Sequence, residues 1–328
     1  MFVTDAESSR QPIVIAGPTG SGKGALAFEL ASRLGGEIVS VDSMKLYREL
    51  DIATAKPSLE ARRGIRCHML DVLEPHEEFS VNDYVRRLGD VLADLSRRQV
   101  QPILCGGTAL YLKAYLAGLQ SGPAPDWELR EQLLAEVSQS GPEALHARLC
   151  TLDPPAAEKI KPTDTRRLVR ALEVVTRTGQ RFSAGWSWSL RQQATGEVRL
   201  FGLAWPRAEL YRRIDLRVGR MVEHGLFAEC RRLGKREPPL SRSVAQAIGY
   251  KEIIDGDAAG LAELEVVEDI RRSTRRFAKR QLTWFRKFPI EWLAAHLDPR
   301  PAVLADEVMA RLCVPPDRAR TLPPGEDP

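Results

Sequence analysis

Cysteine pairs, long apolar runs and a large net charge are all missing from this sequence. The 328-residue chain carries five scattered cysteines and no Cys-x-x-Cys pair, which argues against a disulfide framework and against a zinc site. No apolar run is long enough to span a bilayer, and the opening MFVTDAESSRQP lacks the apolar core of a signal peptide. A net charge of +4 does not by itself indicate nucleic-acid binding. We therefore expect a cytoplasmic protein with no membrane segment.

The N-terminal part of the chain alternates between strand and helix patterns. Short apolar runs, typical of buried parallel strands, lie at 12–17, 37–42 and 101–107. Leucines at helical spacing follow the first run up to Gly35, and helical patterns occupy 79–99 and 108–119. This alternation predicts an α/β fold with a doubly wound parallel sheet.

The pattern changes at the Gly/Pro-rich segment 118–127. From there to about 185 only helical patterns occur, the clearest at 166–179, and 197–206 then predicts a strand that rejoins the sheet. Further helices are expected at about 207–225, 244–255 and 265–287. We therefore predict a P-loop NTPase-like core in two parts (1–120 and 196–312), an all-helical insertion domain (121–195) and a disordered tail (313–328).

The segment GPTGSGKG between the first strand and helix has the spacing of a phosphate-binding loop. Such a loop points backbone N–H groups at an anion, and a lysine adds a positive charge. The predicted site comprises Gly17, Pro18, Thr19, Gly20, Ser21, Gly22, Lys23 and Gly24. The last position is usually Ser or Thr, whose hydroxyl ligates Mg²⁺, so Gly24 weakens an NTPase interpretation. The alternative is a glycine-rich turn with no ligand.

Asp42 follows the second strand and is the only good candidate for a Walker-B carboxylate, although it comes early for that role. The carboxyl end of a strand is where open α/β sheets place their ligands, so Asp42 is expected on the same rim as the phosphate loop. A carboxylate there could act as a general base. Its alternative role is to cap the turn before Ser43.

Arg217 is expected on or beside the inward face of its helix, near Leu210, Ile214 and Met221. A buried arginine is costly unless an anion meets it. The alternative to a ligand is a structural ion pair, with the neighbourhood of Asp215 or with a carboxylate elsewhere.

A basic helix is predicted at 271–287, which holds eight basic residues and no acidic one. The expected buried stripe is Ile270, Phe277, Trp284 and Phe288, with basic flanks at Arg272, Arg276, Lys279 and Arg280. A one-sided basic helix suits RNA phosphates, and the lack of acidic partners within the segment favours RNA over a merely solvated face.

Five segments, at 41–57, 106–119, 166–174, 247–252 and 278–287, together resemble the tRNA dimethylallyltransferases. The resemblance implies a P-loop core with a helical insertion. It also implies transfer of the prenyl group of dimethylallyl diphosphate to the N6 amine of adenine 37, next to the tRNA anticodon. The implied partners are the tRNA anticodon stem-loop and the diphosphate, Mg²⁺ is the implied cofactor, and we expect a monomer.

The resemblance also implies residue roles. Asp42 corresponds to the carboxylate that accepts the amine proton, Thr108 to the hydroxyl at the bridging diphosphate oxygen, and Arg217 to the arginine that neutralises the diphosphate. Positions that correspond to tRNA contacts are Asp42, Ser43, Met44, Lys45, Thr108, Arg130, Arg166, Arg167, Leu168, Val169, Arg170, Tyr250, Lys251, Gln281, Trp284 and Arg286. The three arginines at 166–170 would give the insertion a second basic edge.

Some positions depart from the family pattern. Gly24 replaces Thr or Ser, Lys45 stands where Gln is common, Ala53 where Gly is common, and only His68 remains of a usual His pair. Three other functions stay open at this stage: prenylation of a free adenine nucleotide, a P-loop small-molecule kinase and a non-catalytic RNA-binding module. The helical insertion and the basic helix favour tRNA over a free nucleotide as substrate. Gly24 argues against a kinase. A non-catalytic RNA-binding module would not need Asp42, Thr108 and Arg217 together.

Overall fold

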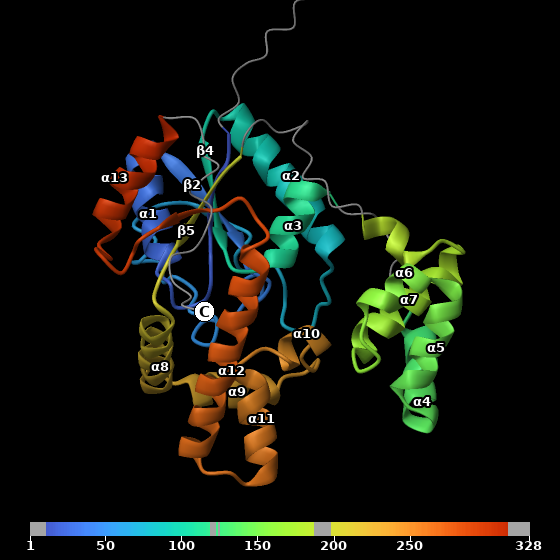
Figure 1. Cartoon of the computed structure of the whole chain (residues 1–328). Coiled ribbons are helices and arrows are strands. Elements are labelled where there is room, and N and C mark those ends of the chain that lie inside the picture. Colours follow the sequence, from blue (N-terminus) through green and yellow to red (C-terminus); the bar gives the residue numbers. More distant parts are fainter. Residues whose placement is uncertain (1–10, 119–122, 124, 187–197, 314–328) are drawn as a thin grey trace, which may run out of the picture. The chain divides into compact units, whose positions relative to one another are not determined.

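The computed structural model of the chain describes residues 11–118, 123, 125–186 and 198–313 (Figure 1). Residues 187–197 and all but the first residue of the expected disordered tail (313–328) therefore lie outside the described residues. The chain divides into two compact units, one formed by 1–115 with 192–328 and the other by 116–191. Among the helices of the described ranges, none combines the length and the apolar character that crossing a membrane requires.

A six-stranded parallel sheet with the strand order β3-β2-β4-β1-β5-β6 forms the centre of the first unit. The strands are β1 (Ile13–Ala16), β2 (Gly36–Val41), β3 (Cys67–His68), β4 (Gln101–Gly106), β5 (Arg199–Leu203) and β6 (Glu291–Leu293). The expected α/β parallel sheet is therefore confirmed. Ala16 lies opposite Gly106, and Gly106 lies opposite Val41, so β1, β4 and β2 end at the same edge.

Close strand approach at this edge depends on Gly106. A Cβ atom at this position would lie 2.0 Å from the carbonyl oxygen of Val41, so only glycine allows β2 and β4 to pair up to their ends. The segments that leave β1, β2 and β4 consequently begin side by side. These segments hold the phosphate loop, Asp42 and Thr108.

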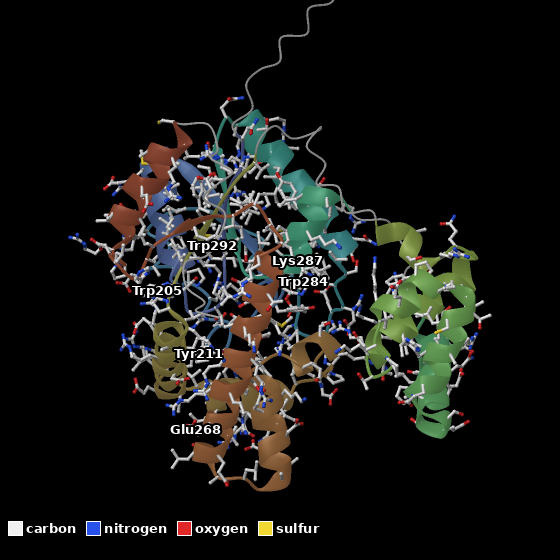
Figure 2. All side chains as sticks on the ribbon, in the orientation of Figure 1. Trp205, Tyr211, Glu268, Trp284, Lys287 and Trp292 are labelled. Carbon is white, nitrogen blue, oxygen red and sulfur yellow. The ribbon has the colours of Figure 1, made fainter. Side chains whose placement is uncertain are left out.

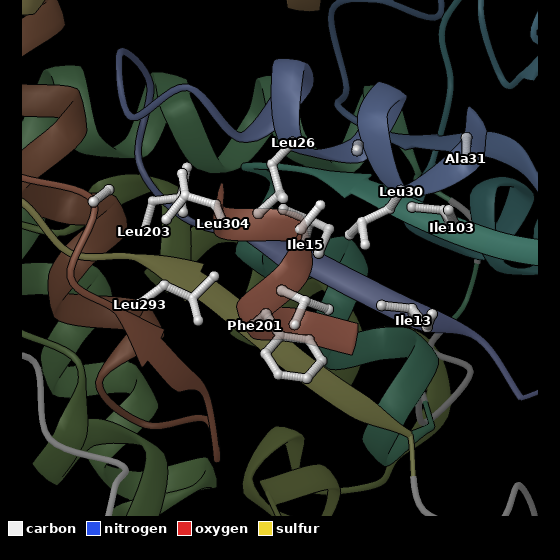
Figure 3. Close-up of a cluster of buried hydrophobic side chains, with 14 of the residues drawn as sticks. Ile13, Ile15, Leu26, Leu30, Ala31, Ile103, Phe201, Leu203, Leu293 and Leu304 are labelled. Atoms are coloured by element: carbon white, nitrogen blue, oxygen red, sulfur yellow. The ribbon is translucent and has the colours of Figure 1, made fainter. Parts of the chain in front are cut away.

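Helices cover both faces of the sheet (Figure 1). On one face α1 (Lys23–Leu34) packs with α13 (Pro301–Leu312), and Leu26, Leu30 and Leu304 meet Ile15 and Phe201 in a buried cluster (Figure 3). On the other face lie α2 (Val81–Arg97) and α3 (Ala109–Ala117), joined by stacked rings of Tyr84 and Tyr111 whose centroids are 3.9 Å apart. This sandwich fixes the direction in which α1 leaves the phosphate loop.

The second half of this unit is helical beyond β5. It contains α8 (Arg207–Glu223), α9 (Leu226–Gly234), α10 (Arg242–Ala245), α11 (Tyr250–Ala259) and α12 (Glu263–Phe285). Leu210 and Ile214 of α8 pack against Ala278 of α12. The expected buried stripe of α12 is partly wrong: Trp284 is 39% exposed and Phe277 only half-buried. Its inner face instead carries Val266, Val267, Ile270, Ala278, Gln281 and Phe285.

The second unit is an all-helical body with its own core. It holds α4 (Trp127–Ser140), α5 (Pro142–Leu152), α6 (Pro154–Lys159), α7 (Thr165–Thr178) and the short 3₁₀ helix η1 (Phe182–Trp186). The core is built around Leu133, Leu145, Leu149, Leu168 and Leu172. The sequence predicts both ends of α7: the Asp164 side chain accepts a hydrogen bond from the Arg167 N–H, and Gly179 closes the helix with φ 66°.

Candidate active site

The phosphate loop runs from Gly17 to Gly24, between β1 and the start of α1. Gly20 and Gly22 have φ values of 81° and 97°, which residues with a side chain rarely adopt. The Lys23 ammonium donates to the carbonyl oxygen of Pro18 at 3.2 Å and so lies across the loop. This geometry fits the predicted anion cradle.

Side chains from distant segments hold the loop from outside. The Trp205 indole N–H donates to the Ser21 carbonyl oxygen at 2.9 Å, and Arg213 Nε donates to the Gly20 carbonyl oxygen at 3.0 Å. The Arg213 guanidinium also lies 4.1 Å from the centre of the Trp205 ring. Sequence reasoning missed both residues, because neither belongs to a recognisable motif.

Gln281 is a third support and the most buried one, with 5% of its surface exposed. Its side-chain oxygen accepts from the Thr19 N–H at 2.8 Å, and its side-chain nitrogen donates to the Gly107 carbonyl oxygen at 2.8 Å. Gln281 was expected to contact tRNA. Its side chain instead ties α12 to the phosphate loop and to the residue before Thr108.

Asp42 and Thr108 lie together at the ends of β2 and β4. Asp42 Oδ1 accepts from the N–H groups of Met44 at 3.0 Å and Lys45 at 3.4 Å. Thr108 Oγ1 accepts from the Ser43 N–H at 3.0 Å. One oxygen of Asp42 thus caps its own turn, while Oδ2 has no hydrogen-bond partner within the described part of the chain.

Arg217 reaches the phosphate loop from α8. Its Nη1 donates to Thr19 Oγ1 at 3.1 Å, and burial lowers the pKa of the guanidinium while Asp42 raises it. Asp215, the candidate partner for a structural ion pair, is instead paired with Arg275 at 2.7 Å. Arg217 thus lies half-buried beside the loop, and Asp42 is the carboxylate that favours its charged form.

Positive charge dominates this site. Burial lowers the pKa of Lys23 to about 8, an effect that Cys105 and Asp42 oppose and that Lys45 and Arg217 reinforce. Burial also lowers the pKa of Lys45 and raises the pKa of the Cys105 thiol, which favours the neutral thiol. Lys23, Lys45 and Arg217 thus influence one another around the single carboxylate Asp42. Such an arrangement is suited to an anionic ligand.

The loop lacks the hydroxyl that usually ligates a magnesium ion after the loop lysine. Gly24 supplies none, and a Cβ atom there would meet nothing within 4 Å. Within the described ranges, no group of three or more His, Cys, Asp or Glu side chains could hold a metal ion. Two further cations, Lys45 and Arg217, lie close enough to Lys23 to lower its pKa.

Several positions expected to contact tRNA have inward-facing side chains. Leu168 and Val169 lie in the core of the insertion, and Tyr250 is fully buried, with its hydroxyl donating to Glu229 at 2.7 Å. These three side chains cannot touch RNA, so their contribution is to support neighbouring surfaces.

Arg130 and Arg170 converge on one buried carboxylate. Both form ion pairs with Glu173, whose side chain has no exposed surface. The pair with Arg130 links α4 to α7, whereas Arg170 and Glu173 both lie on α7. Arg166 and Arg167 on the same helix are exposed, as is Lys251 of α11.

The basic segment of α12 is divided into paired and free charges. Arg271, Arg272 and Arg275 form ion pairs with Glu268, Asp269 and Asp215, acidic residues that lie outside the segment 271–287. Arg276, Lys279 and Arg280 are exposed and form no ion pair within the ranges the structure describes. We call these three the free basic set.

Trp284 and Lys287 extend this surface at the end of α12. Figure 2 shows the two side chains beside each other, with the Lys287 ammonium 5.1 Å from the centre of the Trp284 ring. Arg286 is exposed on the same turn. An exposed aromatic ring among cations is suited to stacking on a nucleic-acid base.

Known proteins share this organisation. The model of a family described as IPP transferase matches residues 45–288. The chain is 42% identical over 288 residues to the tRNA dimethylallyltransferase of Thermomicrobium roseum, which covers 87% of each chain. It is 41% identical over 298 residues to that of Geobacillus thermodenitrificans, covering 90% of this chain and 94% of the relative.

Solved structures are also similar. The tRNA delta(2)-isopentenylpyrophosphate transferase of Staphylococcus epidermidis superposes with a TM-score of 0.67 at 33% identity, over 93% of this chain and 99% of that one. A eukaryotic dimethylallyltransferase acting on tRNA superposes with a TM-score of 0.72 at 26% identity, over 92% and 80% of the two chains. The family match and these extended similarities show that the chain belongs to the IPP transferase family, that of the tRNA dimethylallyltransferases.

Proposed function

We propose that Asp42, Thr108, Arg217 and the phosphate loop carry out the transfer of a dimethylallyl group from dimethylallyl diphosphate to the N6 amine of adenine 37 in tRNA. The observation that carries this assignment is the shared site. Strands β1, β2 and β4 end at the same edge of the sheet, so the phosphate loop, Asp42 and Thr108 begin side by side, and Arg217 donates to Thr19 of the loop. The reaction needs a base and a leaving-group site at such close range.

The chemistry forms one bond and breaks another. The N6 lone pair of adenine forms a bond to carbon 1 of the donor, while the bond from carbon 1 to the bridging oxygen breaks and its electron pair leaves with diphosphate. The amine proton passes to Asp42, whose Oδ2 is available as general base, and from there to solvent. Adenine N6 needs this help because its lone pair is delocalised into the ring.

Stabilising the departing charge is the second task. Backbone N–H groups of the loop, Lys23 and Arg217 bind the diphosphate, and the Thr108 hydroxyl donates to the bridging oxygen. Fixed donors of this kind are effective because they need no reorganisation as charge develops. The Mg²⁺ that the family resemblance implies has no hydroxyl ligand at Gly24, so no step in this scheme depends on it.

tRNA would bind through exposed basic and aromatic side chains. The candidates are the free basic set, Trp284 and Arg286 on α12, Lys251 on α11, and Arg166 and Arg167 on the insertion. A base stacked in a helix cannot reach Asp42, so the target adenine must be unstacked, as loop bases often are. We further propose that the chain acts as a monomer in the cytoplasm.

The test is one set of incubations with dimethylallyl diphosphate and either tRNA, AMP or ATP, followed by mass analysis of the nucleosides. Prenylated adenosine within tRNA alone supports the proposal. Prenylated free nucleotide would indicate an adenylate prenyltransferase, and tRNA binding without product in any arm would indicate an RNA-binding module. A variant Asp42→Asn serves as the inactive control.

A further inference from the structure

We propose that in this chain the Lys45 ammonium provides the positive charge that a loop-bound magnesium ion usually provides, so that diphosphate binds without metal. This inference takes diphosphate as the ligand, and in that respect it rests on the proposed function. The residue itself was expected to contact tRNA, and its surroundings argue for a different role.

Lys45 and Gly24 share one cavity. A pocket of about 560 Å³ is lined by both residues and by Ser40 and Cys105. A Cβ atom on Gly24 would find no neighbour within 4 Å, so the space normally occupied by a Ser or Thr side chain is open. The lysine therefore lines the same cavity as the position where the metal-binding hydroxyl is missing.

The Lys45 ammonium has no partner of its own. Lys23 donates to the Pro18 carbonyl oxygen, and Lys56 pairs with Asp51 and Asp71. By contrast, Lys45 Nζ makes no hydrogen bond or ion pair with any described residue. Its pKa is lowered by burial, and Asp42 is the carboxylate that opposes this effect. A half-buried charge without a partner is costly, and a bound anion would remove that cost.

A pocket that presents one ammonium, unpaired among the described residues, next to Gly24 of the phosphate loop is suited to phosphate oxygens.

The charge balance supports the same conclusion. Lys45 is a third cation, after Lys23 and Arg217, whose charge acts on the surroundings of Asp42. This cation and Gly24, which lacks the usual metal-binding hydroxyl, line one pocket. The departing diphosphate would receive a charge-assisted hydrogen bond from Lys45 as its negative charge develops.

Calorimetric titration with inorganic pyrophosphate in EDTA tests this inference. The wild type is expected to bind, Lys45→Arg to bind nearly as well, and Lys45→Gln to lose about tenfold or more in affinity, as the loss of a charged hydrogen bond implies. Lys235→Gln removes one exposed charge on the same unit and should leave the affinity unchanged. The double variant Lys45→Gln, Gly24→Thr should regain affinity only when Mg²⁺ is added.

Three outcomes would overturn this inference alone. These are wild-type binding that requires Mg²⁺, equal metal-free affinity of Lys45→Gln and wild type, or an equal loss in Lys235→Gln. Binding that requires Mg²⁺ leaves the proposed function intact, because the phosphate loop still holds the ligand. A wild type that binds no pyrophosphate in either buffer would overturn both proposals.

Discussion

At the scale of single residues, the same side chains serve the structure and, as we propose, the chemistry. Asp42 caps its own turn with one oxygen and keeps the other free, and the Thr108 hydroxyl accepts from the Ser43 N–H and donates to Ser43 Oγ at 3.5 Å. The structural and functional alternatives that the sequence left open for Asp42 are therefore compatible. A short polar turn at a strand end positions the Asp42 carboxylate without a separate support.

Donor binding should weaken above pH 8. The Lys23 pKa in the empty site is about 8, so the ammonium is present below that pH and is lost above it. Binding of an anion favours the protonated form. Pyrophosphate affinity should therefore fall by up to about tenfold per pH unit above pH 8 through this group.

A Lys23→Arg variant is the control for this pH dependence, because arginine stays charged throughout the range. Titrations from pH 7 to 10 should show a steeper loss of affinity in the wild type than in the variant. If affinity falls equally steeply with pH in both proteins, the titrating group is not Lys23 but another group, which can be pyrophosphate itself.

Arg217 should matter for turnover far more than its neighbours on α8. We expect Arg217→Ala to lower the prenyl-transfer rate by roughly 10²-fold or more, as the loss of an oxyanion donor does. Arg212→Ala is the matched control, since that arginine is exposed and paired with Glu209. A near-normal rate for Arg217→Ala would remove this residue from the site.

At the scale of elements, the sheet and the helix after the phosphate loop could be predicted because their patterns are strong. Strands β1, β2, β4 and β5 are apolar runs bounded by polar or glycine residues. The two-residue β3 and the three-residue β6 are too short to give a recognisable pattern of hydrophobic residues. Their strand conformation depends on pairing with the edge of the neighbouring strand. Neither α9 nor α13 was predicted, although α13 completes the core over α1.

The inner face of α12 was mispredicted at Phe277 and Trp284. Helical spacing indicates which residues share a face but not how far along the helix a neighbouring element covers that face. Trp284 lies five full turns after the buried Val266 and is nevertheless exposed, while Ala278, Gln281 and Phe285 are the buried residues of this half of the helix. Gln281 could not be foreseen as a support, because its partners Thr19 and Gly107 are remote in sequence.

Removing the Gln281 bridge should loosen the phosphate loop. Gln281→Leu leaves the Thr19 N–H and the Gly107 carbonyl without partners, at roughly 1–3 kcal/mol for each buried group. We expect a lower melting temperature together with weaker pyrophosphate binding. Thr283→Ala removes a hydrogen bond within the exposed face of the same helix and should leave pyrophosphate affinity unchanged.

A loss of melting temperature in Gln281→Leu with unchanged pyrophosphate affinity would contradict the bridging role. The glutamine would then stabilise the packing of α12 without shaping the loop.

At the scale of the whole molecule, the net charge of +4 conceals an uneven distribution. Many arginines are neutralised locally by ion pairs, whereas the free basic set on α12 is not. If RNA phosphates bind there, the logarithm of tRNA affinity should fall steeply with the logarithm of salt concentration. Lys279→Gln should reduce that slope by roughly one.

Arg272→Gln is the matched control on the same helix, because Arg272 is already paired with Asp269. Its salt slope should stay closer to that of the wild type. An affinity that barely changes between low and moderate salt, or equal changes in both variants, would contradict the assignment of this surface to RNA.

The central claim is that a carboxylate and a phosphate loop on neighbouring strands act on one allylic carbon. Its most direct test is a single-turnover measurement of prenyl transfer by Asp42→Asn beside its dissociation constant for dimethylallyl diphosphate. We predict a rate reduced by roughly 10²–10⁴-fold with donor affinity within a few-fold of the wild type, because the amide oxygen can still cap the turn while the base is lost. A variant that binds the donor and transfers the prenyl group at the wild-type rate would contradict the account.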